Sequence, residues 1–357
     1  MDITNTAGRR VTLADVARMA GVSKQTASRV VNGSAQVTEE TRARVLQCVE
    51  ALGFRPSALA RQLTAGRSFT LGVVNNTAAG HLLCGDAYVG MVRQADAMGY
   101  ALLNKEMSNF SRSSVDVMLD QMLERQVDGI ILAGPEIGNS HAWLDDYPLD
   151  SLQMPLVAIN ARARATVAVV GFDNFLAGQN ATRHLLSLQR RRIGHISGPS
   201  DRWVAQRRID GWRAALDEAG LPECKEYCVE GTWEAASGGP ALQHLLELCP
   251  DLDAVFVSSD RMALGVLTEA QRLGIAVPGQ LAVMGIDNET QSEYFNPPLT
   301  TMTQDTPVMA EVALRQLIRQ ICDRHDEPYP AACANEENCM LTHRLIVRES
   351  TAGAAGT

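Results

Sequence analysis

The first fifty residues carry apolar side chains at helical spacing, in three short runs. In the first run they recur at positions i, i+3, i+4 and i+7, which predicts an amphipathic helix over residues 13–20. Thr12 is the expected N-cap of this helix, and Gly21 ends it. Ser23 then caps a second helix that runs to about residue 31. The chain therefore opens with two short helices joined by a turn.

A third helix is expected behind these two. Asn32-Gly33 is a turn signal, Thr38 precedes two glutamates in a first helical turn, and Gly53 closes the helix near residue 52. Pro56 stops the chain again, and residues 57–63 are long enough for only one or two helical turns. Because isolated helices of that length are marginal in water, we expect residues 57–63 to order on a partner.

From residue 70 the pattern changes to apolar, β-rich runs that alternate with segments of helical period. The expected strands are 70–74, 101–103, 129–132, 156–159, 167–170, 193–196, 254–257 and 281–286. Segments with helical period lie between most of them, for example 88–98, 115–125, 204–219 and 262–273. This alternation indicates parallel sheets with helices on both faces. So many strands favour two doubly wound lobes over one open sheet.

Polar side chains follow several of these strands, where ligands bind in doubly wound sheets. They are Asn75, Asn76, Asn160, Asp173, Ser258, Ser259, Asp260, Asp287, Asn288 and Glu289. A small-molecule site is therefore expected at the carboxyl ends of the strands.

The first two helices and their glycine-containing turn form a predicted helix-turn-helix, with the third helix packed behind. The second helix presents Lys24, Gln25, Thr26, Ser28 and Arg29. Gln pairs with adenine and Arg with guanine in the major groove, while Ser and Thr suit phosphates. The alternative is an ordinary three-helix domain with a polar surface, and the charge of this segment disfavours it.

Charge is divided unevenly along the chain. The 357 residues carry a formal net charge of −9, but residues 1–67 have a balance of +5 and the remaining residues one of −14. A basic head on an acidic body indicates that the head meets a polyanion that the body repels. Hydrophobic residues make up 46% and charged residues 20% of the chain, so folded domains are expected rather than disorder.

Several other classes of protein are disfavoured by simpler features. The first ten residues lack the apolar run of a signal peptide, and no stretch has the apolar character of a membrane span, so a cytoplasmic location is expected. Eight cysteines are too dilute for a disulfide scaffold and are expected as reduced thiols. Neither Cys224/Cys228 nor Cys333/Cys339 has CxxC spacing, and no clustered histidines complete a set, so no metal site is expected.

The head resembles the DNA-binding domain of the lactose-repressor family of bacterial transcription regulators, through VTLADVARMAGVSKQTASRVVNG, VTEETRARV and FRPSALARQL. The body resembles the same family in order, through DGIILAG, VGFDN, HISGP, QRRIDGW, VFVSSDRMALGVL, VMGIDN and PPLTTMTQD. The resemblance covers about residues 11–349. It looks closest to lactose-operon-type repressors, through PPLTTMTQD and GTW at residues 231–233.

The resemblance implies an α/β fold with defined domains. These are a helix-turn-helix DNA-binding domain at 1–56, a hinge helix and linker at 57–68, and a two-lobed effector-binding and dimerisation domain at 69–350. The lobes are expected to be doubly wound parallel sheets of the periplasmic-binding-protein type. Lobe 1 is expected at about 69–163 and 299–328, and lobe 2 at about 164–296 and 331–350.

DNA-binding roles follow from the same resemblance. It implies base reading by Lys24, Gln25 and Arg29, and insertion of Leu63 into the minor groove at the centre of a palindromic operator. Further DNA contacts are implied for Thr12, Leu13, Ser23, Thr26, Ser28, Asn32, Ala60 and Arg61. A palindrome needs two heads, and no leucine-heptad segment follows Arg348, so a homodimer is expected.

Effector-binding roles are implied as well. Arg208 matches the arginine that clamps the effector, Asp287 an effector-binding aspartate, and Trp233 an aromatic residue against which a sugar ring lies. The expected effector-binding set also contains Asn160, Asp173, Ser259 and Gln304. Without the resemblance, Arg208 would be interpreted as a solvated helix charge and Trp233 as a core aromatic residue.

Three positions depart from the lactose-type pattern. Asn160 stands where those repressors carry Asp, and Ala133 and Ser259 stand where Asn is usual. An unpaired buried polar group costs about 1–3 kcal/mol, so these changes alter which hydroxyl groups are recognised. The expected effector is therefore a sugar or sugar-derived small molecule, with galactosides left open, and no cofactor is expected.

The sequence thus predicts a repressor of a sugar-utilisation operon. The effector is expected to close the two lobes, disorder the hinges and lower DNA affinity. The alternative is a corepressor-dependent regulator that senses a sugar acid or a purine. An enzyme is disfavoured because the sequence has no GxGxxG after the first strand, no GxxxxGK[ST], no GxSxG and no HExxH.

Overall fold

The computed structural model of the chain describes residues 11–31, 36–55, 62, 66–76, 86–149, 152, 154–326 and 338–352. The chain divides into two compact units between Ser68 and Phe69. Asn32 and the expected hinge residues Ala60, Arg61 and Leu63 lie outside the described residues.

The first unit contains the three expected helices, α1 (Leu13–Ala20), α2 (Lys24–Val31) and α3 (Glu39–Leu52). The start of α1 is fixed by Asp15, whose carboxylate accepts hydrogen bonds from the backbone N–H (3.0 Å) and the hydroxyl (2.7 Å) of Thr12. Gly21 ends α1 in the left-handed conformation, at φ 64°. The core of this unit is formed by Val16, Ala17, Ala20, Ala27, Val30, Val45 and Cys48.

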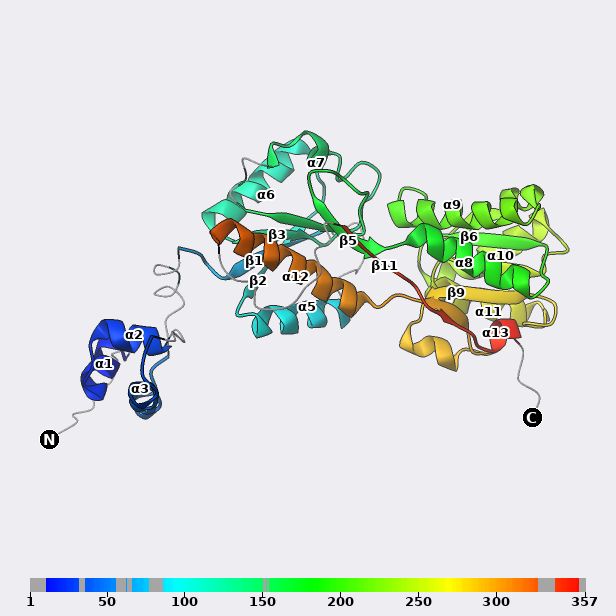
Figure 1. Ribbon diagram of the computed structural model, residues 1–357. Helices are drawn as coiled ribbons and strands as arrows, with labels where there is room; N and C mark the ends of the chain where they lie inside the picture. Colours follow the sequence, from blue (N-terminus) through cyan, green and yellow to red (C-terminus); the bar gives the residue numbers. More distant parts are fainter. Residues whose placement is uncertain are drawn as a thin grey trace. The chain divides into compact units, whose positions relative to one another are not determined.

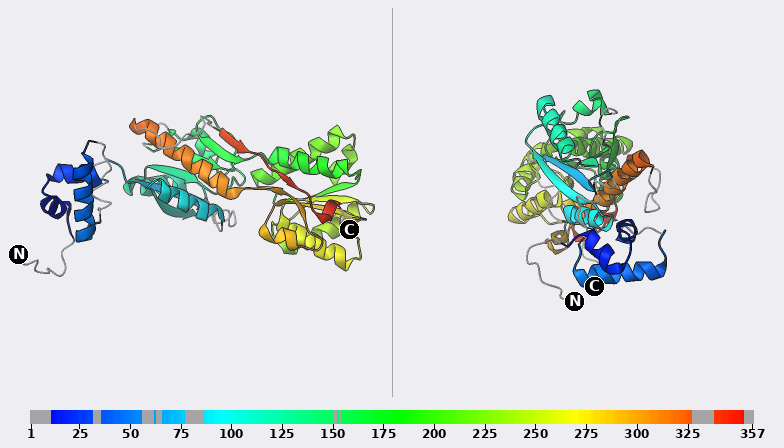
Figure 2. Two further views of the ribbon diagram at one scale, coloured as in Figure 1. Left: turned by 60° about the horizontal axis from the view of Figure 1, so that its bottom comes forward. Right: turned by 90° about the vertical axis from the view of Figure 1, so that its left-hand side faces the viewer.

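The first sheet of the second unit is parallel throughout, in the order β11-β5-β4-β3-β1-β2. Its strands are β1 (Thr70–Asn76), β2 (Ala101–Met107), β3 (Gly129–Leu132), β4 (Leu156–Ile159), β5 (Ala168–Phe172) and β11 (Asn338–Leu341). One face is covered by α5 (Asp86–Ala97) and α12 (Thr306–His325), and the other by α6 (Arg112–Glu124) and α7 (Trp143–Asp146) (Figures 1 and 2).

The second sheet has the order β12-β10-β9-β8-β6-β7, with only β12 antiparallel. Its strands are β6 (Ile193–Ser197), β7 (Cys228–Glu230), β8 (Ala254–Val257), β9 (Ala282–Asp287), β10 (Thr300–Thr303) and β12 (Leu345–Ile346). One face is covered by α8 (Asn174–Ser187) and α9 (Trp203–Glu218), and the other by α10 (Ala235–Leu248) and α11 (Asp260–Arg272). Short helical segments η3 (Pro222–Glu226), η4 (Thr290–Tyr294) and α13 (Glu349–Ala352) complete this lobe. The two doubly wound lobes are therefore confirmed.

Three segments of the chain cross between the sheets, after β5, β10 and β11 (Figure 1). These positions correct the expected lobe boundaries. Strands β5 and β11 belong to the first sheet, although their residues were expected in lobe 2, and β10 belongs to the second sheet, although its residues were expected in lobe 1. A short strand beside a crossover carries no pattern that identifies its sheet, because membership depends on the strand it pairs with.

Two glycines determine how closely α8 and α9 pack. A Cβ atom on Gly178 would lie 2.2 Å from the backbone oxygen of Arg208, and one on Gly211 would lie 1.9 Å from the backbone oxygen of Phe175. Only glycine leaves room for this approach of two backbones. The contact fixes α9, and therefore Arg208, against α8.

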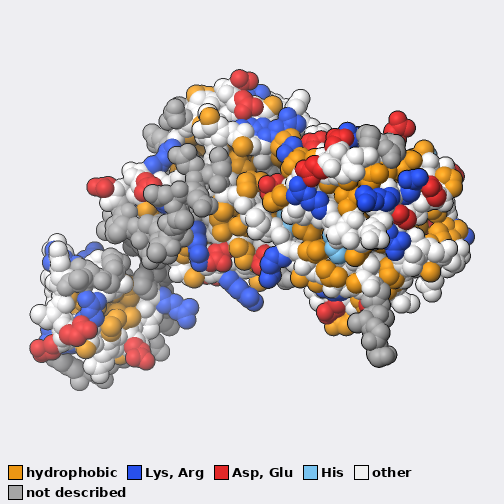
Figure 3. All heavy atoms as spheres, turned by 45° about the vertical axis from the view of Figure 1, so that its right-hand side comes forward, with side chains coloured by type: hydrophobic (Ala, Val, Ile, Leu, Met, Phe, Trp, Pro, Cys, Tyr) orange, Lys and Arg blue, Asp and Glu red, His pale blue; other side chains and the backbone are white. Residues whose placement is uncertain are grey.

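The surface of the second unit mixes both signs of charge. Ion pairs such as Arg183–Glu218 (2.8 Å) and Arg261–Glu289 (2.9 Å) join exposed or half-exposed side chains. On the face shown in Figure 3, basic and acidic side chains adjoin and neither sign forms one continuous patch. Among the described residues, no helix reaches the length and hydropathy of a membrane span, and no group of His, Cys, Asp and Glu is arranged to hold a metal ion.

Candidate functional site

The exposed face of α2 carries the residues expected to read DNA. Lys24, Gln25 and Arg29 are exposed, whereas Ala27 and Val30 on the opposite face are buried. Within the described part of the chain, the side chains of Lys24, Gln25 and Arg29 make no hydrogen bond to another residue. Their donor and acceptor groups are therefore available to base edges.

The remaining expected contacts in the head support this helix or lie beside it. Ser23 caps α2, because its Oγ accepts a hydrogen bond from the N–H of Thr26 (3.1 Å). Thr26 and Ser28 are half-buried. Thr12 is exposed at the start of α1, and Leu13 packs against the core. The Ser23 cap fixes the start of α2, and the N-terminal turn that follows is exposed, which is where a recognition helix contacts bases.

In the second unit, Arg208 is the centre of the expected effector site. Its side chain is buried, Nε donates to Asn174 Oδ1 (2.8 Å), and Nη1 donates to the backbone oxygen of Ser258 (2.6 Å). Burial lowers its pKa, and the nearby carboxylates of Asp287 and Asp260 oppose that shift. No described residue accepts a hydrogen bond from Nη2, so this group is available to a ligand.

Asp287 lies at the carboxyl end of β9 and is held by Gln304. The Nε2 of Gln304 donates to Asp287 Oδ1 (2.6 Å), and the Gln304 N–H donates to the Asp287 backbone oxygen (3.2 Å). Burial raises the pKa of Asp287 to about 8, against the attraction of Arg208. Gln304 begins a crossover, so this pair joins the expected site to a segment that connects the lobes.

Trp233 lies beside Arg208. The guanidinium carbon is 5.7 Å from the centre of the indole ring, and the ring is only partly buried. A Cβ atom on Gly198 would come within 2.0 Å of two indole carbons, so the glycine makes room for the ring. Arg208 therefore lies beside Trp233 and within electrostatic range of Asp287, which Gln304 holds.

The other three expected residues have structural partners of their own. Asn160 Oδ1 accepts a hydrogen bond from the backbone N–H of Phe172 (3.3 Å). Asp173 caps α8, because its Oδ1 accepts a hydrogen bond from the N–H of Leu176 (2.9 Å). Ser259 caps α11 in the same way, through a hydrogen bond from the N–H of Met262 to its Oγ (3.2 Å). Each lies at the carboxyl end of a strand, as expected. Their direct contact with an effector stays a prediction.

Backbone strain is concentrated in this region. Asn160, Trp233, Asp287 and Asn288 have φ angles of 50°, 71°, 128° and 56°. Non-glycine residues in this part of conformational space cost about 1–3 kcal/mol each, and such strain is typical of binding sites. Four of the eight described non-glycine residues with positive φ belong to this group of strand ends.

Sequence reasoning gave no specific role to several residues that shape the site: it placed Ser258 and Asp260 only among the polar strand ends, and it did not name Asn174. Asn174 and the Ser258 backbone orient Arg208, and Asp260 accepts hydrogen bonds from Thr301 Oγ1 (2.7 Å) and Ser292 Oγ (2.5 Å). His343, on the third crossover, contacts Phe172 with 5.1 Å between ring centres. Burial and Arg208 lower the pKa of His343 to about 3. The Asp-Asn pair after β5 is a signal that could have identified Asn174, whereas nothing in the local sequence points to His343.

The fold and these groups define a DNA-binding head joined to a two-lobed ligand-binding body. Comparison with known proteins agrees with this class. Residues 12–57 match the family described as "Bacterial regulatory proteins, lacI family", and residues 182–351 match the "Periplasmic binding protein-like domain".

Similar proteins cover nearly the whole chain. Catabolite control protein A of Priestia megaterium is 32% identical over 96% of this chain and 99% of its own length, and the HTH-type transcriptional regulator CelR of Thermobifida fusca is 32% identical over 96% and 98%. The HTH-type transcriptional repressor PurR of Escherichia coli is 31% identical over 96% and 97%.

Solved structures show the same relationship. A CelR–cellobiose complex has a TM-score of 0.66 at 30% identity, covering 96% of this chain and all of that one. A Lac repressor dimer bound to operator and the anti-inducer ONPF has a TM-score of 0.78 at 25% identity, covering 96% and 99%. The chain belongs to the lacI family of bacterial regulatory proteins, and it is a DNA-binding transcriptional repressor of that family.

Proposed function

We propose that this chain is a homodimeric repressor of a sugar-utilisation operon, released from a palindromic operator by a small sugar or sugar-derived inducer. The observation that carries the proposal is the pairing of Arg208 with Trp233 in a body that is attached to a DNA-reading head. A guanidinium group donates to hydroxyl oxygens, and an indole face accepts the C–H face of a sugar ring. The cellobiose in the CelR complex and the Lac repressor dimer bound to its operator support the same assignment.

The proposed mechanism uses the two units in turn. In the dimer, the α2 helices of two heads enter successive major grooves, with Lys24, Gln25 and Arg29 on base edges. The hinge segments around Leu63 widen the minor groove at the centre of the operator. Inducer bound by Arg208 changes the arrangement of the lobes, and DNA affinity falls. By linkage, operator binding weakens inducer binding by the same factor.

The small molecule acts as an effector that is bound and released unchanged. Hydrogen bonds fix both carboxylates at the strand ends, Asp260 through Thr301 and Ser292 and Asp287 through Gln304, and this fixed arrangement supports a role in binding. The proposal therefore includes no cofactor and no chemical reaction. It places the protein in the cytoplasm, where the operator DNA is located.

A thermal-shift screen of the full chain against galactosides, other sugars, sugar acids and purines tests the class of effector. A ligand at 100 times its dissociation constant adds about 2.7 kcal/mol to the free energy of unfolding, which is readily detected. A hit among sugars that also releases operator DNA supports the proposal. A purine or sugar acid that strengthens operator binding would replace it with the corepressor alternative. A hit that leaves operator binding unchanged would overturn the regulatory role of the site.

A further inference from the structure

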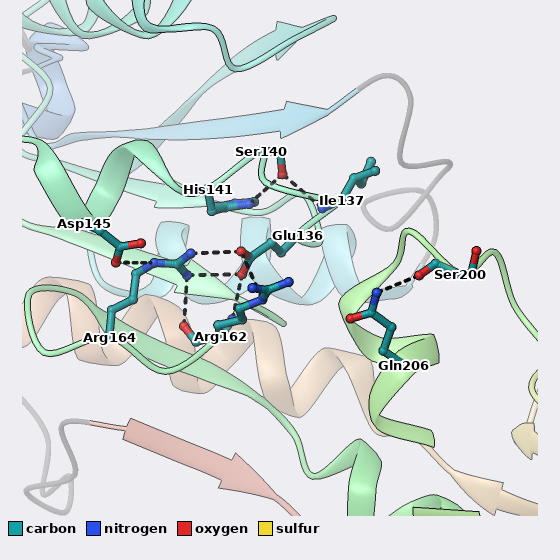
Figure 4. Close-up of polar contacts among 9 residues, drawn as sticks. All are labelled: Glu136, Ile137, Ser140, His141, Asp145, Arg162, Arg164, Ser200 and Gln206. Atoms are coloured by element: carbon teal, nitrogen blue, oxygen red, sulfur yellow. Dashed lines mark hydrogen bonds and ion pairs between the residues drawn. The ribbon is translucent and has the colours of Figure 1, made fainter. Parts of the chain in front are cut away.

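A buried carboxylate outside the effector group ties together two loops of the first lobe. Glu136 follows β3 and is 1% exposed. Arg164 donates to both of its oxygens (2.9 and 3.1 Å), and the backbone N–H of Arg162 donates to Oε2 (2.8 Å), as Figure 4 shows. Burial is the largest single influence on the pKa of Glu136 and raises it, but the hydrogen bonds from Arg164 and the Arg162 backbone, with the charge of Arg164, together outweigh burial, so the pKa is below its ordinary value. The carboxylate therefore stays ionised and holds both loops.

The same loop contacts the second lobe. The N–H of Gly138 donates to the backbone oxygen of Asp201 (2.6 Å), and the N–H of Trp203 donates to the backbone oxygen of Glu136 (3.2 Å). Ile137 and Arg202 pair as an antiparallel bridge. Trp203 is the first residue of α9, so its N–H has no partner within the helix. The carbonyl of Glu136 supplies that partner from the other lobe.

A side chain reinforces this backbone contact. The guanidinium carbon of Arg162, in the first lobe, lies 5.0 Å from the ring centre of Trp203, in the second. Arg162 Nε is 3.6 Å from Glu136 Oε1, so the carboxylate also orients the cation. Cation–π contacts of this kind contribute about 0.5–2 kcal/mol. The two lobes are linked covalently by the three crossovers. In addition, lobe 1 contacts the start of α9 through two backbone hydrogen bonds and one cation–π contact.

We propose that Glu136 and Arg162 form an interlobe joint that positions α9 for the effector and favours the closed arrangement of the lobes. The elements that meet in the joint also carry the expected effector residues, since Asn160 follows β4 and Arg208 lies five residues beyond Trp203 on α9. Glu136 is a positioning residue that acts on Arg208 through the helix. This inference rests on the proposed function, in which the effector acts by changing the arrangement of the lobes. A ligand shifts the equilibrium between two lobe arrangements only as far as its affinities for the two arrangements differ. A joint that stabilises one arrangement therefore sets the effector concentration needed to change the populations.

Hydrogen exchange of the full chain, measured by mass spectrometry without DNA or ligand, tests the joint directly. In Arg162→Ala, peptides that contain the amides of Gly138 and Trp203 should exchange roughly 3- to 10-fold faster, because the cation–π contact is lost. Arg162→Lys, which keeps a cation, should restore part of the protection. Peptides from β3 and from α8 should exchange as in the unmodified protein.

Arg112→Ala is the matched control. Its guanidinium carbon lies 4.3 Å from the Tyr147 ring centre and its Nε 3.4 Å from Asp116, so it has the same two kinds of contact wholly within lobe 1. This variant should leave both joint peptides unchanged. Glu136→Gln should loosen the joint further, and Arg162→Ala carries the test if that variant does not fold, because the Arg162 side chain is 43% exposed.

The joint is overturned if Arg162→Ala leaves both peptides protected, or if Arg162→Lys exchanges as fast as Arg162→Ala. It is equally overturned if protection is lost throughout lobe 1, since that outcome describes a purely structural residue. None of these results involves operator or effector, so they leave the proposed function standing. Failure of the ligand screen, in turn, would leave the exchange result intact.

Discussion

The guanidinium carbon of Arg208 lies 5.7 Å from the ring centre of Trp233, and two hydrogen bonds to Asn174 and Ser258 fix its orientation. The two acceptors come from different elements, the first turn of α8 and the end of β8. The Nε and Nη1 groups of Arg208 thus hold the side chain in place, and Nη2 remains available to a ligand beside the Trp233 ring. A hydroxylated ring needs both an edge donor and a face, so changes to either residue should affect effector binding more than DNA binding.

Arg208→Lys should separate these two activities. Lysine keeps the charge but lacks the planar guanidinium, which donates hydrogen bonds to Asn174 and Ser258 and has a further N–H group for a ligand. Loss of a charged hydrogen bond costs about 1.5–3 kcal/mol, so the effector concentration for half release should rise roughly 10- to 100-fold. Fluorescence anisotropy of a labelled operator, titrated with the effector found in the screen, measures the change, and affinity for operator without effector should stay within about threefold.

Arg183→Lys serves as the control for Arg208→Lys. Arg183 lies on α8 and pairs with Glu218 at the surface (2.8 Å), away from the effector residues and from Trp203. Its response to effector should remain near that of the unmodified protein. Normal release by the Arg208→Lys variant would remove Arg208 from the site.

Gly198→Ala should displace Trp233 without changing any polar group. The new Cβ would overlap two indole carbons at 2.0 Å, so the ring must leave its position. Effector affinity should then fall to the level of Trp233→Ala, as isothermal titration calorimetry would show. Gly279→Ala is the control, because its nearest neighbour is 3.6 Å away. Unchanged affinity in Gly198→Ala would mean that Trp233 does not line the effector site.

Arg29→Ala should relax operator specificity. Arg29 is exposed on α2, and a bidentate contact with guanine contributes about 1–3 kcal/mol of discrimination, so one base pair of the operator should lose roughly 5- to 150-fold in selectivity. Binding to a set of single-base operator variants measures this. Arg272→Ala removes the same charge from α11, where Arg272 pairs with Glu269, and should preserve the profile. A uniform loss across all operator variants in Arg29→Ala would indicate a phosphate contact instead.

The head was predicted almost to the residue because its signals are local. Thr12, Ser23, Gly21 and Gly53 act within one turn of their own positions, so the sequence around them determines where helices begin and end. The buried parallel strands were found for a similar reason, since each is a continuous apolar run.

Strand β10 was missed because its core positions are polar. Thr300 Oγ1 donates to the backbone oxygen of Arg348 (2.9 Å) and Thr301 Oγ1 donates to Asp260 (2.7 Å). These partners lie 48 and 41 residues away in the chain, and they satisfy hydroxyl groups that would otherwise make burial costly. Glu136 and Arg164 are likewise 28 residues apart, so no local pattern predicts that they meet.

Acid should destabilise the second lobe through His195. The ring is buried between Trp212 and Phe256, Nδ1 lies 2.9 Å from the Phe256 backbone oxygen, and burial lowers the pKa to about 3. Because the folded pKa lies below the ordinary 6.5, the unfolded chain binds the proton first as pH falls. The stabilisation is therefore complete above about pH 6.5 and is lost progressively towards pH 3. Between pH 6.5 and 5 it should decrease by about 2 kcal/mol.

His195→Gln removes this titration and keeps a polar side chain of similar reach. Urea unfolding followed by circular dichroism should show a smaller loss of stability between pH 7 and 5 than in the unmodified protein. His244→Gln, at an exposed position of α10, should keep the original pH dependence. If His195→Gln and the unmodified protein lose stability equally over this range, another group controls acid unfolding. The backbone oxygen of Ser258 holds Arg208, and its Oγ lies 3.3 Å from His195 Nε2, so the same measurement reports on the support beneath the effector site.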